Sequence, residues 1–203
     1  MTGEKVKRVV VVGGGTAGWM CAVSLAKLIG RDLDVTLIES DEIGTVGVGE
    51  ATIPTFFALH QLLKIDEAKF LAEVQGTIKL GISFENWKQL GEDYIHAFGY
   101  TGKSCWAAGF QHFWLKGKSL GISEEYSHYS PELMAAKANK FGLLKQNALN
   151  YAYHLDASAY AKFLRRMAEQ NGVRRVEGKI VTVNQHESGD LSDVVLESGL
   201  SVS

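Results

Sequence analysis

The sequence predicts an α/β fold that is built on a parallel βαβ unit. The first observation is local: an apolar strand, a glycine turn, an amphipathic helix and a second apolar strand follow one another within residues 8–38. Two strands joined by a helix over about 30 residues form a parallel pair. The second observation is compositional. The 203 residues are 46% hydrophobic and 22% charged, which is typical of a globular protein and excludes a disordered, collagen-like or coiled-coil chain.

Each element of the βαβ unit has its own support. Residues 8–12 read RVVVV, and a continuous β-branched run predicts a strand that is buried on both faces. Residues 16–29 carry apolar side chains at helical spacing, and Gly30 suits the end of that helix. Residues 34–38 form the second apolar strand. The turn from the first strand into the helix therefore lies at residues 13–15.

The next elements are shorter. Residues 41–51 are rich in glycine and predict a loop, and helices are expected from about Pro54 and over residues 67–74. Over residues 78–84, apolar and polar residues alternate, which predicts one strand with one buried face. Lys79 falls on the polar side of this strand, where a lysine is ordinarily solvated.

The second half of the chain leaves the βαβ pattern and then returns to it. Residues 90–150 hold many glycines, aromatics and histidines, with a helical stretch at 131–139, and we interpret them as an insertion. A helix capped by Asp156, a strand over 173–184 and a β-hairpin around Ser198-Gly199 follow, the last two as part of a β-meander. The expected segments are 1–89, 90–150 and 151–203.

Charge and cysteine content narrow the class of protein. The net charge of −2 lacks the basic excess that nucleic-acid binding requires. Cys21 and Cys105 fit neither a disulfide framework nor a thiolate metal site, and His112, His128 and His154 lack the spacing of a metal cluster. No signal peptide or membrane-spanning run is evident. We expect a cytoplasmic protein that binds no metal, membrane or nucleic acid.

The segment GGGTAG at residues 13–18 is the strongest local motif. It follows a strand, opens a helix, and is followed by Glu39 at the end of the next strand, which is the context of a Rossmann-type dinucleotide site. Gly13 permits the tight turn, Gly15 the approach of a pyrophosphate to the backbone, and Gly18 close packing of helix and strand. The helix N-terminus would bind the phosphates and Glu39 the ribose. The alternative is a glycine turn without a nucleotide.

A second glycine-spaced segment, residues 46–54, follows soon after Glu39. It could wrap a large cofactor with its backbone amides, or it could be a flexible connection. The motif residues alone do not distinguish FAD from NAD.

Several motifs together resemble the flavin-dependent tryptophan halogenases. The specific ones are GGGTAGW at residues 13–19 and GVGEATIP at residues 47–54, followed by Lys79 on a strand closed by FENW at residues 84–87. Looser matches are HAFG at 96–99, HFW at 112–114 and HLDA at 154–157. On this resemblance residues 1–89 begin an FAD-binding domain that includes the lysine strand, 90–150 form an inserted substrate-side region, and 151–203 return to the FAD-binding domain.

The resemblance implies an activity. Members of the family take FADH2 from a separate flavin reductase, and with O2 they oxidise a bound halide, chloride or bromide, to hypohalous acid. The acid passes through a tunnel to a lysine, which holds it by hydrogen bonding or as a haloamine, and an indole or tryptophan-type ring is halogenated. Lys79 matches that lysine, provided that it is buried rather than solvated. A homodimer is an expectation of the resemblance alone.

The resemblance and the motifs also imply the binding residues. His96 and Phe98 match positions that line the indole pocket, although a satisfied histidine and a core aromatic are equally good interpretations of the residues themselves. The residues expected to bind the cofactor are Gly13, Gly15, Thr16, Ala17, Gly18, Glu39, Ser40, Ile43, Gly49, Ala51 and Ile180.

The chain also departs from the family. It lacks the Trp-x-Trp-x-Ile-Pro box and the later glutamate that acts with the lysine, so we expect about the first two-fifths of a halogenase, apparently truncated. Two alternatives stay open: a flavin-dependent aromatic monooxygenase, which needs no such lysine, and an inactive FAD-binding fragment. The basic residues between 162 and 175 are interpreted as a solvated helix face, with a docking patch for the flavin reductase as a remote alternative.

Overall fold

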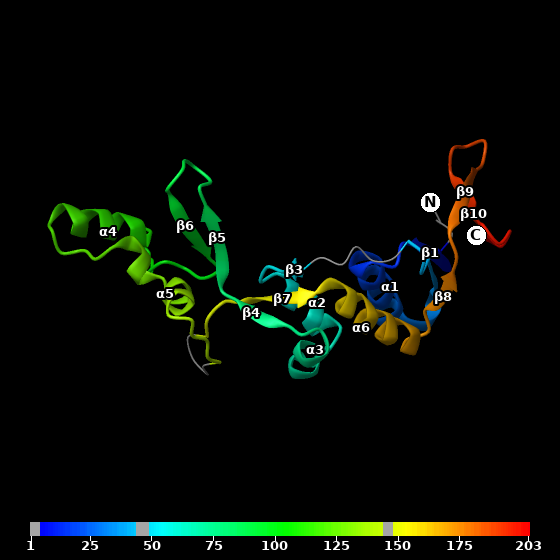
Figure 1. Ribbon diagram of the computed structural model, residues 1–203, viewed down its shortest axis with the longest axis horizontal. Coiled ribbons are helices and arrows are strands. Elements are labelled where there is room, and N and C mark those ends of the chain that lie inside the picture. The colour runs from blue at the N-terminus through cyan, green and yellow to red at the C-terminus, as the bar shows by residue number, and fades with distance from the viewer. Residues whose placement is uncertain (1–4, 44–48, 144–147) are drawn as a thin grey trace. The chain divides into compact units, whose positions relative to one another are not determined.

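The computed structural model describes residues 5–43, 49–143 and 148–203, and it shows a mixed α/β chain, as the sequence predicted. The chain divides into two compact units (Figure 1). The first contains Met1–Glu50, Leu59–Gly76 and Leu155–Ser203, and the second contains Ala51–Ala58 and Thr77–His154. These units follow chain packing, whereas the three predicted segments describe functional regions, so that segmentation stays a prediction.

The predicted βαβ unit is confirmed in the first unit. β1 (Arg8–Val12) and β2 (Asp34–Glu39) are parallel, and α1 (Thr16–Ile29) connects them. β8 (Arg174–Glu177) pairs in parallel with the other edge of β2, which gives the order β1-β2-β8. Burial on both faces was expected for the first strand and is wrong. β1 lies at the edge of this sheet and is at most half-buried, whereas the central strand β2 is buried over four residues.

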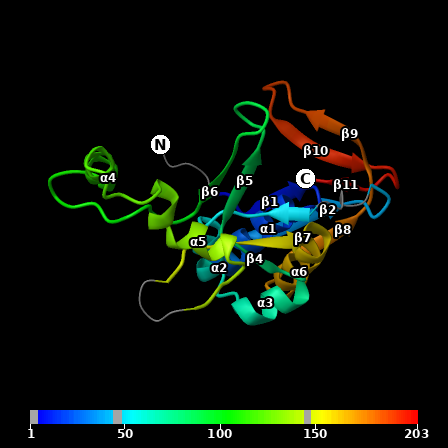
Figure 2. The ribbon, with the colours of Figure 1, turned by 60° about the vertical axis from the view of Figure 1, so that its left-hand side comes forward.

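Helix α6 (Ala157–Gln170) packs against α1 beside this sheet (Figures 1 and 2). It begins where predicted, because the Asp156 carboxylate accepts a hydrogen bond of 2.8 Å from the Ala159 amide. Tyr160, Leu164 and Ala168 recur at helical spacing on its buried face. α3 (Glu67–Glu73) also contacts α6, and a 3₁₀ turn, η1 (Gly30–Asp32), follows α1.

The predicted strand over residues 173–184 is wrong as a single element. Gly178 has a φ of +151°, a conformation available mainly to glycine, and the chain leaves the parallel sheet there. β9 (Ile180–Gln185) then joins an antiparallel sheet with β10 (Leu191–Leu196) and β11 (Ser201–Val202), which confirms the terminal hairpin (Figure 2).

Two small sheets lie largely in the second unit. β4 (Thr77–Lys79) pairs antiparallel with β7 (Ala152–Asp156), in a sheet of order β3-β7-β4 in which β3 is Gly49–Ala51. β5 (Gly81–Glu85) pairs with β6 (Asp93–Ala97). The remaining elements are α2 (Phe56–Leu62), which passes from this unit into the first, α4 (Phe110–Ser119), η2 (Tyr126–Tyr129) and α5 (Pro131–Lys137).

The prediction of one strand over residues 78–84 is therefore wrong. The segment changes its pairing partner at Leu80, from β7 to β6. Gly81 allows the backbones of β5 and β6 to lie close together after this change, since a Cβ there would lie 2.6 Å from the His96 carbonyl oxygen. Among the described residues, none of the helices has both the length and the apolar character needed to cross a membrane.

Candidate functional site

The glycine turn opens onto a groove in the first unit with a volume of about 450 Å³. The groove lies where β1 and β2 end, and α6 forms one of its walls. In an open parallel sheet this is where nucleotides bind. Six of the predicted cofactor residues line it, namely Gly13, Gly15, Glu39, Ser40, Ile43 and Ile180.

The glycines of the motif lie in different steric environments. Gly13 has a φ of +110°, and its amide donates to the Ile38 carbonyl at 2.8 Å. A Cβ on Gly18 would lie 1.9 Å from the Gly13 carbonyl oxygen, so only glycine allows the helix to start this close to the turn. A Cβ on Gly15 would meet nothing within 4 Å. The space at Gly15 is therefore available to a ligand.

Gly14 has a steric role at the groove that sequence reasoning missed. A Cβ there would lie 1.5 Å from Oε2 of Glu39. The middle glycine thus makes room for the acid at the end of β2. The only signal in the sequence was that residues 13–15 are all glycine, whereas the motif leaves position 14 unspecified.

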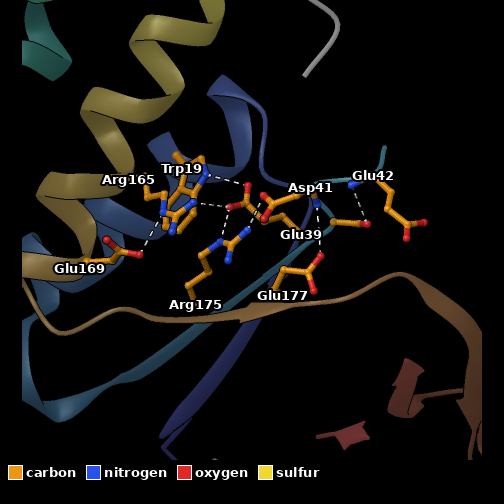
Figure 3. Close-up of polar contacts among 9 residues, drawn as sticks. Trp19, Glu39, Asp41, Glu42, Arg165, Glu169, Arg175 and Glu177 are labelled. Atoms are coloured by element: carbon orange, nitrogen blue, oxygen red, sulfur yellow. Dashed lines mark hydrogen bonds and ion pairs between the residues drawn. The ribbon is translucent and has the colours of Figure 1, made fainter. Parts of the chain in front are cut away.

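Three donors hold the Glu39 carboxylate at the groove (Figure 3). Oε2 accepts from the Trp19 indole at 3.2 Å, while Oε1 accepts from Arg165 at 3.3 Å and from Arg175. The Glu39 side chain is only 13% exposed. Arg175 also binds Asp41 at 2.6 Å. Glu39 is thus oriented by the protein before any ligand binds.

This arrangement limits how Glu39 can bind a ribose. A carboxylate oxygen accepts about two hydrogen bonds, and Oε1 already has two arginine donors. Oε2 retains one acceptor site, next to Gly14. The interpretation of residues 162–175 as a solvated basic face is wrong for Arg165 and Arg175, because β2, β8 and α6 bring both guanidinium groups to the same carboxylate.

The remaining predicted cofactor residues do not line the groove. Thr16, Ala17 and Gly18 form the first turn of α1, and the Thr16 hydroxyl donates to Glu50 at 3.2 Å. Gly49 begins β3, and Ala51 belongs to the second unit. Residues 44–48 of the second glycine segment lie outside the described residues. The open backbone at Gly15, the uncapped start of α1 and the oriented carboxylate suit a dinucleotide cofactor such as FAD.

Lys79 lies in the second unit and is only 7% exposed. Its ammonium group donates to the Thr52 carbonyl at 3.1 Å and lies 5.3 Å from the centre of the Phe98 ring. Burial lowers the pKa of Lys79. A lysine on the polar side of a strand is ordinarily solvated, but Lys79 has the burial that the predicted chemistry requires, because the strand changes partner at Leu80 and Phe98 lies next to the amine.

His154 and Lys79 line the same cavity, which has a volume of about 330 Å³. β7 pairs with β4 so that Thr77 lies opposite His154 and Lys79 opposite Ala152, which places Lys79 and His154 on one face of the strand pair. Burial and the charge of Lys79 both lower the pKa of His154. Lys140 lines this cavity too. No carboxylate is among the described lining residues.

The two predicted substrate residues differ in position. Phe98 is half-buried and lies against Lys79, whereas His96 is exposed on β6. Neither residue is among those that line the cavity. Their role in binding an indole stays a prediction. Among the described residues no group of three His, Cys, Asp or Glu side chains is arranged to hold a metal ion.

A buried polar pair supports the first unit. His60 on α2 and Tyr160 on α6 form a hydrogen bond of 3.0 Å beside the Phe70 ring. Burial lowers the pKa of His60 to about 4. Burial and the nearby charge of Glu50 raise the pKa of Tyr160. Both groups are therefore neutral at pH 7.

The sequence matches the family profile described as "Tryptophan halogenase" over residues 8–203. The chain belongs to the tryptophan halogenase family. Tryptophan 7-halogenase RebH of Lentzea aerocolonigenes is 33% identical over 214 residues, which cover 96% of this chain and 40% of RebH. The resemblance expected from the motifs is confirmed.

Solved structures of halogenases share the fold. Xcc4156, a flavin-dependent halogenase from Xanthomonas campestris, superposes with a TM-score of 0.94 at 53% identity, over 98% of this chain and 41% of Xcc4156. BrvH, a flavin-dependent halogenase from Brevundimonas sp. BAL3, superposes with a TM-score of 0.88 at 35% identity, over 98% of this chain and 41% of BrvH. The chain thus spans about two-fifths of the length of these halogenases.

Proposed function

We propose that the protein carrying this chain is an FADH2-dependent halogenase that acts on an indole or tryptophan-type ring, with Lys79 as its catalytic residue. The observation that supports this most directly is the environment of Lys79, a buried amine in contact with an aromatic ring and without a carboxylate among the described lining residues of its cavity. The similarity to tryptophan 7-halogenase RebH and to the flavin-dependent halogenase Xcc4156 supports it as well.

The groove of the first unit has the features that FAD requires. The amides at the start of α1 would bind the pyrophosphate next to Gly15, and Glu39 would accept a ribose hydroxyl through Oε2. Ile43 and Ile180 supply apolar surface to the same groove. When bound, reduced flavin supplies with O2 the oxidising equivalent that converts chloride or bromide to hypohalous acid.

Lys79 would hold the hypohalous acid next to the ring to be halogenated. As an ammonium it donates a hydrogen bond to the acid. As a free amine, its nitrogen forms a bond to the halogen while the oxygen–halogen bond breaks and the released hydroxide takes the amine proton as water. Burial lowers the pKa of Lys79 and so increases the fraction of free amine. Phe98 would offer a face against which a flat indole packs.

A separate flavin reductase that supplies FADH2 is part of this proposal, as are a cytoplasmic location and a homodimer. The family match supports the reductase, because a flavin-dependent halogenase consumes reduced flavin in each cycle.

The test uses the natural protein that carries this chain, supplied with a flavin reductase, FAD, O2 and chloride or bromide, with tryptophan and indole as substrates. Lys79→Ala and Lys79→Arg should lower the rate of halogenation at least about 10³-fold, since both remove the nucleophilic amine. Lys88→Ala is the matched control, because the Lys88 side chain is 74% exposed on the surface.

The products separate the alternatives. A hydroxylated product that persists in Lys79→Ala would identify an aromatic monooxygenase. Stoichiometric flavin binding without any product would identify an inactive flavin-binding protein. If the unaltered protein halogenates none of several indoles, the proposed function is wrong.

A further inference from the structure

Thr52 is tied to strand β7 by both its main chain and its side chain. Its amide donates to the Tyr153 carbonyl at 2.9 Å. Its hydroxyl accepts from the Tyr153 amide at 2.9 Å and donates to the Tyr153 carbonyl at 3.3 Å. Thr52 is 9% exposed and Tyr153 is 1% exposed. The hydroxyl thus accepts from the Tyr153 amide as a strand carbonyl would and shares the Tyr153 carbonyl with the Thr52 amide, and water does not compete for these bonds.

The anchor on β7 is itself rigid. Tyr153 pairs with Ile78 on β4 along the opposite edge of β7. Its ring packs against Phe56 and Phe57, with ring centres 6.3 and 5.1 Å away. A residue locked to Tyr153 is therefore fixed relative to β4, the strand that carries Lys79.

The Thr52 carbonyl is the acceptor for the Lys79 ammonium, at 3.1 Å. Lys79 extends from β4, so its side chain crosses β7 to reach this carbonyl. The residue opposite Lys79 on β7 is Ala152, which is fully buried and small enough to let the lysine pass over it. One end of the lysine is held by strand pairing and the other by the carbonyl of Thr52, a residue that three hydrogen bonds connect to Tyr153.

We infer that Thr52 is a positioning residue for Lys79: its hydroxyl locks its main chain to Tyr153 and thereby holds its carbonyl oxygen as the acceptor for the lysine amine. The inference rests on the proposed role of Lys79 and adds the residue that fixes where the amine lies. A hydroxyl is needed there because it both accepts and donates, whereas valine has the shape of threonine and does neither.

The test compares three substitutions of Thr52 in the natural protein that carries this chain. Thr52→Val keeps the volume and loses both hydroxyl bonds, Thr52→Ser keeps the hydroxyl, and Thr52→Cys keeps only a weak hydrogen-bonding group. Thr55→Val is the matched control, because Thr55 lies three residues further on and is exposed.

The first readout needs no halogenation. Competitive acylation with acetic anhydride over a range of pH, followed by mass spectrometry, measures the pKa of Lys79 directly, with exposed Lys88 as the internal reference. Loss of a fixed acceptor disfavours the ammonium form, so Thr52→Val should lower the pKa of Lys79 by about 1. Thr52→Cys should fall between Val and Ser, and Thr55→Val should match the unaltered protein.

The second readout is the rate of halogenation. Thr52→Val should lower kcat about tenfold with little change in KM, because the amine is misplaced while the substrate surface is intact. Thr52→Ser should restore most of the rate. Circular dichroism shows whether Thr52→Val folds. If it does not, the Lys79 pKa and the kcat of Thr52→Cys are compared with those of Thr52→Ser to test the positioning role.

The outcomes separate this inference from the proposed function. An unchanged Lys79 pKa and an unchanged kcat in folded Thr52→Val and Thr52→Cys would overturn the positioning role. A shifted pKa in a protein that halogenates nothing would support the positioning role and refute the proposed function.

Discussion

The groove next to the glycine motif and the lysine site are built in opposite ways. The groove depends on one continuous motif, residues 13–18, and on one acid that follows at the end of the next strand. The lysine site joins Thr52, Lys79, Phe98 and Tyr153, which are far apart in sequence and meet only because strands pair in one register. A local motif is evident from the sequence, whereas a register is not. The two regions should therefore respond differently to substitution.

The largest effect is expected within the motif. Gly18→Ala places a Cβ 1.9 Å from the Gly13 carbonyl oxygen, and because backbone must move, the free energy of unfolding should fall by about 4 kcal/mol. Gly15→Ala meets nothing within 4 Å, so it should cost less than about 1 kcal/mol. It should still weaken FAD binding about tenfold or more, since the methyl group occupies the space next to the pyrophosphate.

Chemical denaturation and flavin titration check this pair. Equal losses of stability in the two variants would show that Gly15 is structural, and the contrast between a steric and a ligand-facing glycine would disappear. Unaltered FAD affinity in Gly15→Ala would contradict the placement of the pyrophosphate.

A smaller effect concerns acid stability of the first unit. The pKa of His60 is lowered to about 4 from 6.5, so the unfolded chain takes up a proton before the folded one does. The contribution of neutral His60 to the free energy of unfolding is fully present above pH 6.5. It is lost as the pH falls toward 4, by about 3 kcal/mol in total. His60→Gln should remove this part of the pH dependence, and His112→Gln, at an exposed position, should not.

Unfolding by denaturant between pH 7 and 4 measures, for each of the two variants, how the free energy of unfolding changes with pH. A His60→Gln protein that retains the slope of the unaltered protein would show that another group controls acid unfolding. The expected result would assign this part of the acid dependence to His60.

The smallest effect distinguishes two neighbouring arginines on α6. Arg165 binds Glu39 in the groove, whereas Arg166 binds Glu73 on the surface. Arg165→Gln should weaken FAD binding about fivefold, because Glu39 loses one of its orienting donors but keeps Arg175 and Trp19. Arg166→Gln should leave FAD affinity unchanged, since exposed ion pairs contribute little. Similar affinities for the two variants in a flavin titration would contradict the orienting role of Arg165.

The sequence alone was sufficient for the βαβ unit. Its strands and helix depend on interactions between near neighbours: β-branched runs, helical spacing and glycine at Gly13 and Gly30. The same holds for the helix capped by Asp156 and for the terminal hairpin. Family membership also followed from contiguous motifs.

The tertiary structure decided where strands change partners. Two predicted strands were each divided, one at Leu80 and one at Gly178, because the chain on either side pairs with a different sheet. Alternation of apolar and polar residues describes one face of one sheet and contains no information about such a change. Burial of β1 was misjudged for a related reason, since an edge strand and a central strand can have the same composition.

The sequence by itself determined a glycine turn and an acid at the end of the next strand, and the family resemblance predicted a role for Lys79. Only the tertiary structure decided that Arg165, Arg175 and Trp19 converge on that acid, and that Thr52 and Phe98 enclose the lysine. The physical reason is the sequence distance over which the interactions act. Backbone conformation is set by a few neighbouring residues, whereas the pKa and the orientation of a side chain depend on groups that folding brings together from distant parts of the chain.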